Sequence, residues 1–137
     1  STIINLLNKP TILRFGGLDV LKIEKILKKK VLIKTNSKKK IAPGQFLLHY
    51  SPGIPLRTNA KKPKKNEAFV LMKKRKTTFK NYYYLSKKND LHQSAKNLYS
   101  LLRKIKKDGY KMIAVEKIQN KGIGKTINDR LNRASKF

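Results

Sequence analysis

The alternation of apolar and polar residues is most regular from about residue 67 to residue 137. Short apolar runs at 69–72, 82–85 and 111–115 predict strands. Apolar residues at helical spacing predict one helix after the second run and another near the end: Leu91, Ala95, Leu98, Leu102 and Ile105 in the first, and Ile123, Ile127 and Leu131 in the second.

The first of these helices also carries start and stop signals. Asn89 or Asp90 is placed to cap its beginning, and Gly109 follows its last apolar residue. The order strand, strand, helix, strand, helix predicts a small α/β sandwich with a partly parallel sheet.

Residues 1–33 show a shorter pattern of the same kind. Apolar stretches at 1–7 and 11–14 predict two short strands separated by a turn. Apolar residues at helical spacing then predict a short helix with an acidic start and a basic end, which suits the helix dipole: Val20, Ile23 and Leu27. Because the chain opens directly in an apolar stretch, with Ser1 in place of Met, we expect a piece of a longer protein.

Residues 34–66 differ in composition. They hold four of the five prolines and two lysine runs, with little apolar periodicity. Composition therefore predicts a linker between 1–33 and a second unit at 67–137. Four apolar residues nevertheless stand close together among the prolines, and they predict an ordered loop that packs on another surface: Phe46, Leu47, Leu48 and Tyr50.

The charge of the chain is extreme, since 35 Lys and Arg against 7 Asp and Glu give a formal net charge of +28. Clustered cations are typical of nucleic-acid binding. Only six of the 35 are Arg, however, and the lysine pairs are scattered along the whole chain, whereas a binding face would concentrate them and favour Arg. We therefore favour a compositional bias towards lysine, with nucleic-acid contact as the alternative.

Other function classes are excluded by what the sequence lacks. It contains no Cys, which excludes disulfides and Cys-based zinc sites, and two isolated His with seven carboxylates leave no metal cluster. No apolar run approaches the roughly 18 residues of a membrane-spanning helix, and no signal-peptide pattern opens the chain. We expect a cytoplasmic protein without membrane contact.

The segment Gly122-Ile-Gly-Lys-Thr126 is similar to a phosphate-binding loop, whose backbone amides and Lys hold a nucleotide. Its spacing does not fit, because the motif needs a Gly five positions before Gly124 and residue 119 is Gln. We predict instead that the two glycines form a tight turn into the last helix.

Three further local signals have structural explanations that we favour. Tyr82 to Tyr84 lie beside lysines, as in base-stacking surfaces, but alternation along a strand turns at least one of them into the core. His92 falls on the polar side of the predicted helix. Asp129 and Arg130 are a candidate catalytic pair, and an exposed helix ion pair is the commoner arrangement.

His49 and Tyr50 are stronger candidates, because they stand between prolines in a loop too apolar for a spacer. Two hypotheses remain open for them. Either the imidazole and the phenol bind phosphate or shield an intermediate, or Tyr50 is a purely structural hydrophobic latch.

Three segments, in the correct order, resemble the long form of threonylcarbamoyl-AMP synthases. Residues 43–55 (Pro-Gly-Gln-Phe-Leu-Leu-His-Tyr-Ser-Pro-Gly-Ile-Pro) are similar to the interdomain signature of that family. Residues 1–5 with 13–17 resemble the end of its catalytic domain, and residues 122–134 resemble the end of its accessory C-terminal domain. The matches span nearly the whole chain.

The resemblance implies both a reaction and a fold. The family condenses L-threonine, bicarbonate and ATP into threonylcarbamoyl-AMP and pyrophosphate, for modification of adenosine 37 in tRNA, and the intact enzyme uses ATP with magnesium. The implied fold is a Rossmann-like α/β sandwich with a partly parallel sheet at 67–137, a linker and lid loop at 34–66, and the remnant of an α+β catalytic domain at 1–33.

The resemblance also implies roles for individual residues. Ser1 and Thr2 would lie at the nucleotide, and Arg14 would contact its phosphates. Part of the linker would close over the catalytic cleft as a lid that excludes water from the carbamate and its mixed anhydride: Pro43, Gly44, His49, Tyr50 and Pro52. The chain departs from the family pattern at Asn5, usually Asp, and at Phe15, usually Pro.

The 17 leading residues supply too little of the catalytic domain to form a cleft. We therefore assign no catalytic residue, and we expect that the chain alone binds no ATP and catalyses nothing. It would act with the missing catalytic domain, in the same chain or a separate one. A non-enzymatic basic module that binds tRNA or other nucleic acid is the alternative, and the product of a decayed gene is a third hypothesis.

Overall fold

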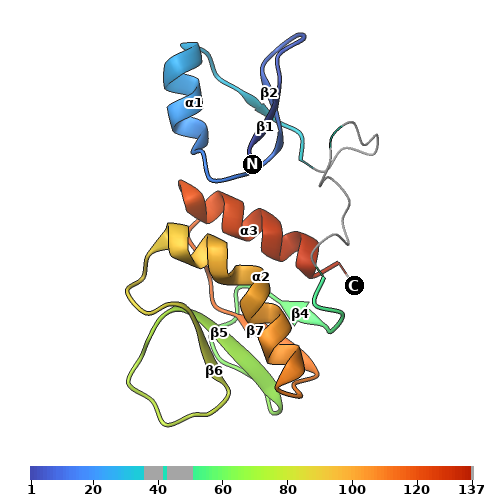
Figure 1. Cartoon of the computed structure of the whole chain (residues 1–137), viewed down its shortest axis with the longest axis vertical. Coiled ribbons are helices and arrows are strands. Elements are labelled where there is room, and N and C mark those ends of the chain that lie inside the picture. Colours follow the sequence, from blue (N-terminus) through green and yellow to red (C-terminus); the bar gives the residue numbers. More distant parts are fainter. Residues whose placement is uncertain (36–41, 43–50, 137) are drawn as a thin grey trace.

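The computed structural model describes residues 1–35, 42 and 51–136. Two separate sheets divide these residues, and we refer to residues 1–35, with the smaller sheet, as the N-terminal unit and to residues 51–136, with the larger sheet, as the C-terminal unit. Figure 1 shows the N-terminal unit on one side of helix α3 (Ile123–Ala134), with helix α2 (Leu91–Lys107) and the larger sheet on the other side.

The N-terminal unit contains a three-stranded sheet in the order β1-β2-β3. The two apolar runs correctly predicted β1 (Ile3–Asn5) and β2 (Thr11–Arg14), which pair antiparallel. β3 (Leu32–Ile33) pairs in parallel with β2. This third strand was not predicted, because two residues are too few to show a period.

Helix α1 (Val20–Leu27) covers this sheet on one side. It begins where the Asp19 side chain accepts a hydrogen bond from the Leu21 amide at 3.0 Å, which satisfies one of the unpaired donors of the first turn. Its apolar side completes a small core that is formed by three buried residues: Ile12, Val20 and Ile23.

The C-terminal unit contains a four-stranded sheet in the order β4-β7-β5-β6. The strands are β4 (Leu56–Arg57), β5 (Glu67–Lys73), β6 (Tyr82–Ser86) and β7 (Met112–Val115). All its pairings are parallel, so the α/β sandwich with parallel strands is confirmed. β4 falls within residues 34–66, so the segment with the composition of a linker also supplies one strand of this sheet.

The two long helices lie where the apolar spacing predicted them. α2 begins at the Asp90 cap, whose side chain accepts from the Gln93 amide at 3.0 Å. After its end, Gly109 adopts a φ of +93°, a conformation that strongly favours glycine. None of the helices among the described residues combines the length and apolar character needed to span a bilayer.

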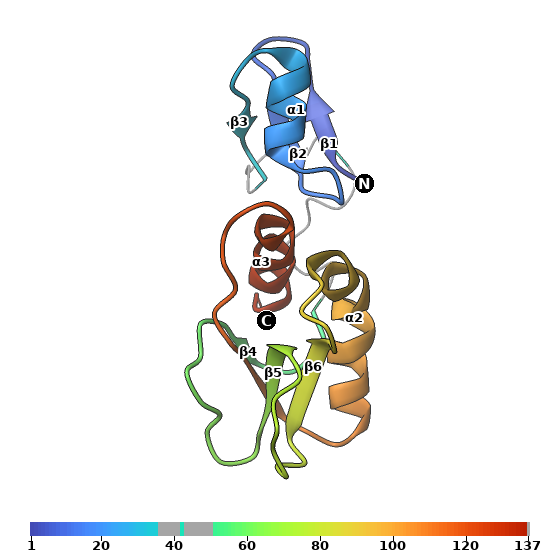
Figure 2. The ribbon, with the colours of Figure 1, turned by 90° about the vertical axis from the view of Figure 1, so that its left-hand side faces the viewer.

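Side chains alternate between the two faces of the larger sheet. One face packs on α2 and α3 through apolar residues such as Val70, Leu85 and Ile113. The other face is covered by the segment that joins β4 to β5, where Ala60 packs on Phe69 and its neighbours. Figure 2 shows α2 along one side of the sheet and this joining segment on the other.

The three tyrosines of β6 follow the same alternation. Tyr83 packs on the helix side of the sheet, while Tyr82 and Tyr84 pack on the opposite side. All three are partly buried. The prediction that at least one of them joins the core is confirmed.

Helix α3 carries a buried ion pair that also connects the two units. Arg133 Nε donates to Asp129 Oδ2 at 2.9 Å, and both side chains are buried. Arg133 Nη2 donates to the carbonyl oxygen of Thr35 at 2.9 Å. The predicted exposed pair of Asp129 with Arg130 is therefore wrong: one helical turn separates Asp129 from Arg133, and both turn inward.

Candidate functional site

The three residues predicted to contact a nucleotide lie together at the start of β1. Arg14 Nε donates to the carbonyl oxygen of Ser1 at 2.9 Å. Thr2 Oγ1 accepts from the Gly16 amide at 3.1 Å and donates to the carbonyl oxygen of Leu18 at 3.3 Å. The structure therefore brings Arg14 to Ser1, 13 residues away, and the adjacent Thr2 bonds to the loop after β2; we call Ser1, Thr2 and Arg14 the N-terminal cluster.

Gly16 lies in the loop after β2 and lets the backbone of this loop approach the backbone of Thr2 closely. A Cβ added at Gly16 would lie only 2.1 Å from the backbone nitrogen of Thr2, so no other residue fits without a shift of the backbone. The Gly16 carbonyl oxygen also accepts a buried hydrogen bond from Thr126 Oγ1 of α3 at 2.7 Å. One glycine thus fixes the cluster and ties it to the C-terminal unit.

The two positions that depart from the resembled pattern have structural roles here. Asn5 Oδ1 accepts from the Leu7 amide at 2.9 Å and so stabilises the turn after β1. Phe15 is half-buried and packs against the small core of the N-terminal unit.

The N-terminal unit leaves much apolar surface uncovered. Among the described residues ten large hydrophobic side chains are exposed, and seven of them belong to this unit: Leu6, Leu7, Leu18, Leu21, Ile26, Leu32 and Ile33. Leu7 is 89% exposed and Ile26 is 77% exposed. Such concentrated apolar exposure is typical of a surface that another protein segment covers.

Most of the predicted lid residues lie outside the described residues: Pro43, Gly44, His49 and Tyr50. Pro52 is described and is buried. It lines a pocket of about 310 Å³ against α2, together with Ser51, Tyr99 and Arg103. The end of the linker is thus packed on the C-terminal unit.

The segment from Gly122 to Thr126 forms the turn into α3 and packs against neighbouring backbone. Gly122 has a φ of +56° directly before α3, and a Cβ at Gly124 would lie 1.9 Å from the carbonyl oxygen of Gln119. The predicted tight turn into the last helix is confirmed. The hydroxyl of Thr126, which a phosphate loop would direct at a ligand, is instead bonded to Gly16.

Several carboxylates of the C-terminal unit are engaged in structure. Glu67 accepts from Arg57 Nε at 2.8 Å and from Arg57 Nη2 at 2.7 Å, and these bonds hold the pKa of Glu67 below its ordinary value. Burial raises the pKa of the Tyr83 phenol, and its hydrogen bond to Asp108 at 2.8 Å raises that pKa further. Tyr83 therefore stays protonated at neutral pH.

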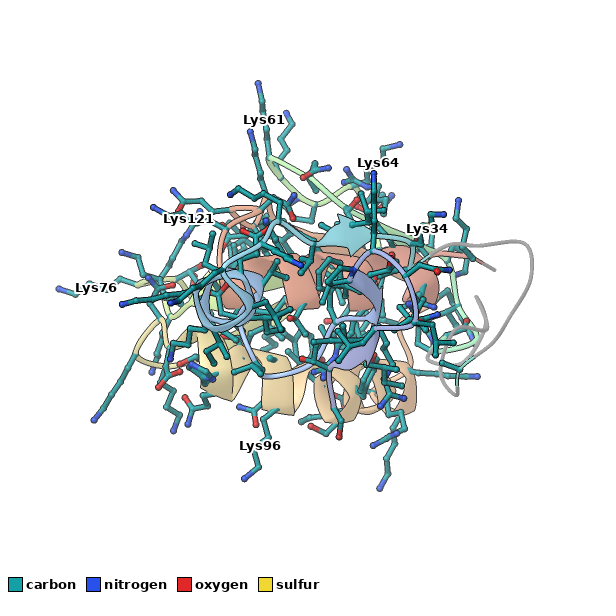
Figure 3. The ribbon with its side chains drawn as sticks, turned by 90° about the horizontal axis from the view of Figure 1, so that it is seen from above. Lys34, Lys61, Lys64, Lys76, Lys96 and Lys121 are labelled. Atoms are coloured by element: carbon teal, nitrogen blue, oxygen red, sulfur yellow. The ribbon has the colours of Figure 1, made fainter. Side chains whose placement is uncertain are left out.

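The lysines project from the molecule in many directions. Figure 3 shows the labelled ones around the whole outline: Lys34, Lys61, Lys64, Lys76, Lys96 and Lys121. This distribution agrees with the scatter of lysines along the sequence, and the part of the chain that the structure describes shows no single basic face.

An open pocket of about 390 Å³ lies at the carboxyl edge of the larger sheet, and sequence reasoning missed it. Its walls include Lys73, Arg75, Glu116, Lys117 and Lys121. A weak signal was present in the sequence, since Lys73 directly follows the apolar run of β5 and Lys117 comes two residues after β7. It could not be distinguished among 29 lysines spread over the chain.

Comparison with protein families gives one match that covers most of the chain. The model of the threonylcarbamoyl-AMP synthase C-terminal domain matches residues 18–136. Among curated proteins no sequence matches significantly.

Two solved structures share the fold. The crystal structure of P. abyssi Sua5 complexed with L-threonine is 24% identical, with a TM-score of 0.77, over 98% of this chain and 45% of that chain. A P. abyssi Sua5 variant, with one His and the adjacent Tyr replaced by Ala, is 22% identical, with a TM-score of 0.72, over 98% and 44%. The chain therefore spans less than half the length of these proteins.

Proposed function

The chain belongs to the threonylcarbamoyl-AMP synthase C-terminal domain family, and on this basis we propose that it acts as the C-terminal part of such a synthase. The intact enzyme would join L-threonine, bicarbonate and ATP into threonylcarbamoyl-AMP, release pyrophosphate, and so supply the modification of adenosine 37 in tRNA. The family match over residues 18–136 supports this role, as does the shared fold with a Sua5 structure that contains L-threonine.

The observation that carries the proposal is the uncovered apolar surface of the N-terminal unit. Seven exposed large hydrophobic side chains on so small a unit need a partner surface. The partner we propose is the remaining part of the catalytic domain, because the similar solved chains are more than twice as long as this one. Covering a side chain such as Leu7 or Ile26 would contribute about 1.5–3 kcal/mol.

In this assembly the cluster of Ser1, Thr2 and Arg14 would form one side of the ATP site. Arg14 is the group suited to the phosphates, since a guanidinium donates several hydrogen bonds in a fixed geometry. The partner domain would supply the rest of the nucleotide and threonine pockets. We expect that the chain alone releases no pyrophosphate.

The linker would gate the completed active site. His49-Tyr50 is the one His-Tyr pair in the sequence, and a His and its adjacent Tyr are the residues replaced in the P. abyssi Sua5 variant. A closed loop would protect the carbamate and the mixed anhydride, because both hydrolyse when water has access. Packing of Pro52 on the C-terminal unit would anchor one end of this loop.

Mixing the chain with a purified catalytic-domain fragment of the family tests the proposal. Threonine-dependent pyrophosphate release is measured for the chain, for the fragment and for the mixture. We expect no release by the chain alone and faster release by the mixture than by the fragment. An unchanged rate together with no binding would contradict the assignment.

The gating role has its own test in the same mixture. Tyr50→Ala should lower the rate of pyrophosphate release, because the loop would no longer exclude water. Phe79→Ala is the matched control, since Phe79 is an exposed aromatic residue of the C-terminal unit. Equal rates for Tyr50→Ala and the unaltered chain would refute the gate and leave the docking proposal standing.

We propose contact with tRNA as a secondary role, supported by the net charge of +28. Affinity that persists near physiological salt and depends on individual side chains would support a specific contact. A steep fall of affinity with salt, without dependence on RNA structure, would indicate diffuse charge alone.

A further inference from the structure

The pocket at the carboxyl edge of the larger sheet is lined by both apolar and basic side chains, and we call its exposed lysines the rim. It has a volume of about 390 Å³, within the usual range of small-molecule sites. Leu91 and Ile118 contribute apolar side chains, and Ile118 is buried. Lys73, Lys117 and Lys121 are exposed along the rim. This arrangement suits a ligand with one flat apolar part and one anionic part.

The charge of the pocket is strongly unbalanced. Glu116 is its one lining carboxylate, and that carboxylate is already engaged. Its Oε1 accepts from the Met72 amide and its Oε2 from Arg75 Nη2, both at 2.6 Å. The three rim lysines form no ion pair with any described residue. Several cations that line one pocket without paired counter-charges attract an anion.

The wall that carries Lys117 and Lys121 is held in place by the fold. Asn128 Nδ2 donates to the carbonyl oxygen of Ile118 at 3.0 Å, which ties this loop to α3. Gly124 packs directly against the carbonyl of Gln119, so the loop lies as close to α3 as a backbone permits. The pocket is therefore preformed, and a ligand would not have to order it.

The position of the pocket in the sheet is also one that favours ligands. After β5 the chain leads to β6 on one side, whereas β7 lies on the other side of β5 and leads to α3. The connections therefore diverge at the carboxyl ends of two adjacent parallel strands. In open α/β sheets ligands bind in the crevice at such a point.

We propose that this pocket binds a phosphate-bearing small molecule of nucleotide size. Lys73, Lys117 and Lys121 would contact the phosphate, Arg75 would stay oriented by Glu116, and Leu91 with Ile118 would face the apolar part. This ligand goes beyond the role proposed for the chain as part of a synthase, because it concerns residues 72–121 alone.

Titration calorimetry of the 137-residue chain tests the proposal, with AMP, adenosine and inorganic phosphate as probes. We expect AMP to bind more tightly than phosphate, and adenosine to bind far more weakly than AMP. The double variant Lys117→Gln with Lys121→Gln should weaken AMP binding by about tenfold or more, since each removes a charge-assisted contact.

The control removes the same charge elsewhere. Lys61→Gln with Lys64→Gln alters two exposed lysines of the segment between β4 and β5, which the pocket does not include. AMP affinity should change by less than about twofold in this control. Equal losses in both double variants would overturn the proposal, because they would indicate diffuse attraction.

Further arms of the experiment exclude other sites and ligands. Loss of AMP binding in Arg14→Gln but not in the pocket variant would place the ligand at the N-terminal cluster and overturn the proposal. Binding of tRNA without binding of AMP would overturn it as well. Failure of the pyrophosphate assay would not change these results, so the two proposals fail separately.

Discussion

The two units of the described chain bury their apolar residues to very different extents. In the C-terminal unit sixteen buried residues form one cluster between the sheet and two helices. In the N-terminal unit three described residues form the core, while seven large hydrophobic residues are exposed. The first unit satisfies its own apolar surface, and the second depends on contacts beyond its own residues. Hydrogen bonds from Thr126 and Arg133 of α3 attach the N-terminal unit, and we propose that a catalytic partner domain covers its exposed apolar residues.

The largest expected effect concerns the buried side chain that joins the units. Arg133→Ala removes the partner of buried Asp129 and the donor to the Thr35 carbonyl. Breaking a buried pair from one side should lower the free energy of unfolding by about 3–5 kcal/mol. Urea denaturation measures it, with exposed Arg103→Ala as the control. A change below about 1 kcal/mol would mean that the joint contributes little.

Truncating one leucine in each unit compares their burial directly. Leu102 is 1% exposed in the C-terminal core, and Leu102→Ala should lower the free energy of unfolding by about 2–5 kcal/mol. Leu7 is 89% exposed, and Leu7→Ala should change it by less than about 0.5 kcal/mol. Similar losses in the two variants, measured by the same urea titration, would refute the contrast in burial.

A smaller effect is expected at the hydroxyl that ties Gly16 to α3. Thr126→Val keeps the shape of the side chain and removes the donor to the Gly16 carbonyl, which should cost about 1–3 kcal/mol. Hydrogen exchange should then become faster in α1 while α2 keeps its protection, because the N-terminal unit has fewer attachments. Uniform acceleration in both helices would show that the two units unfold together.

The smallest expected effect is a pH dependence within the C-terminal unit. Hydrogen bonds from Arg57 lower the pKa of Glu67 below the ordinary value of 4.5, so the folded state favours the charged form. This contribution is fully present above the unfolded pKa and is lost as pH falls through the folded pKa. Glu67→Gln should therefore remove about 1 kcal/mol near neutral pH and flatten the acid side of the stability curve. An unchanged acid side would refute this assignment.

Periodicity predicted the elements that bury a continuous apolar stripe. Leu98, Leu102 and Ile105 repeat at helical spacing, and that pattern located α2, while the choice between Asn89 and Asp90 as its cap needed the structure. β3 and β4 have two residues each, and strands so short carry no pattern that a sequence can show. Their pairing depends on partners far along the chain, which no local rule supplies.

In the candidate sites, too, local sequence patterns failed to predict contacts that depend on the folded chain. Ser1, Thr2 and Arg14 were identified through a resemblance, and spacing does not reveal the bond of Arg14 to Ser1 or the close approach of Gly16 to Thr2. The sequence suggested a pair of Asp129 with Arg130 because the two opposite charges are adjacent in the chain. The helix instead places Arg133 one turn away, where both groups share a buried environment.

We propose above all that the exposed apolar residues of the N-terminal unit dock on a catalytic domain. Calorimetric titration of the chain into the catalytic-domain fragment at several temperatures tests it most directly. We predict binding with a negative heat-capacity change, and at least about tenfold weaker binding for Leu7→Ser with Ile26→Ser than for the control Phe79→Ser. No binding, or equal affinity of the docking variant and the control, would contradict the claim.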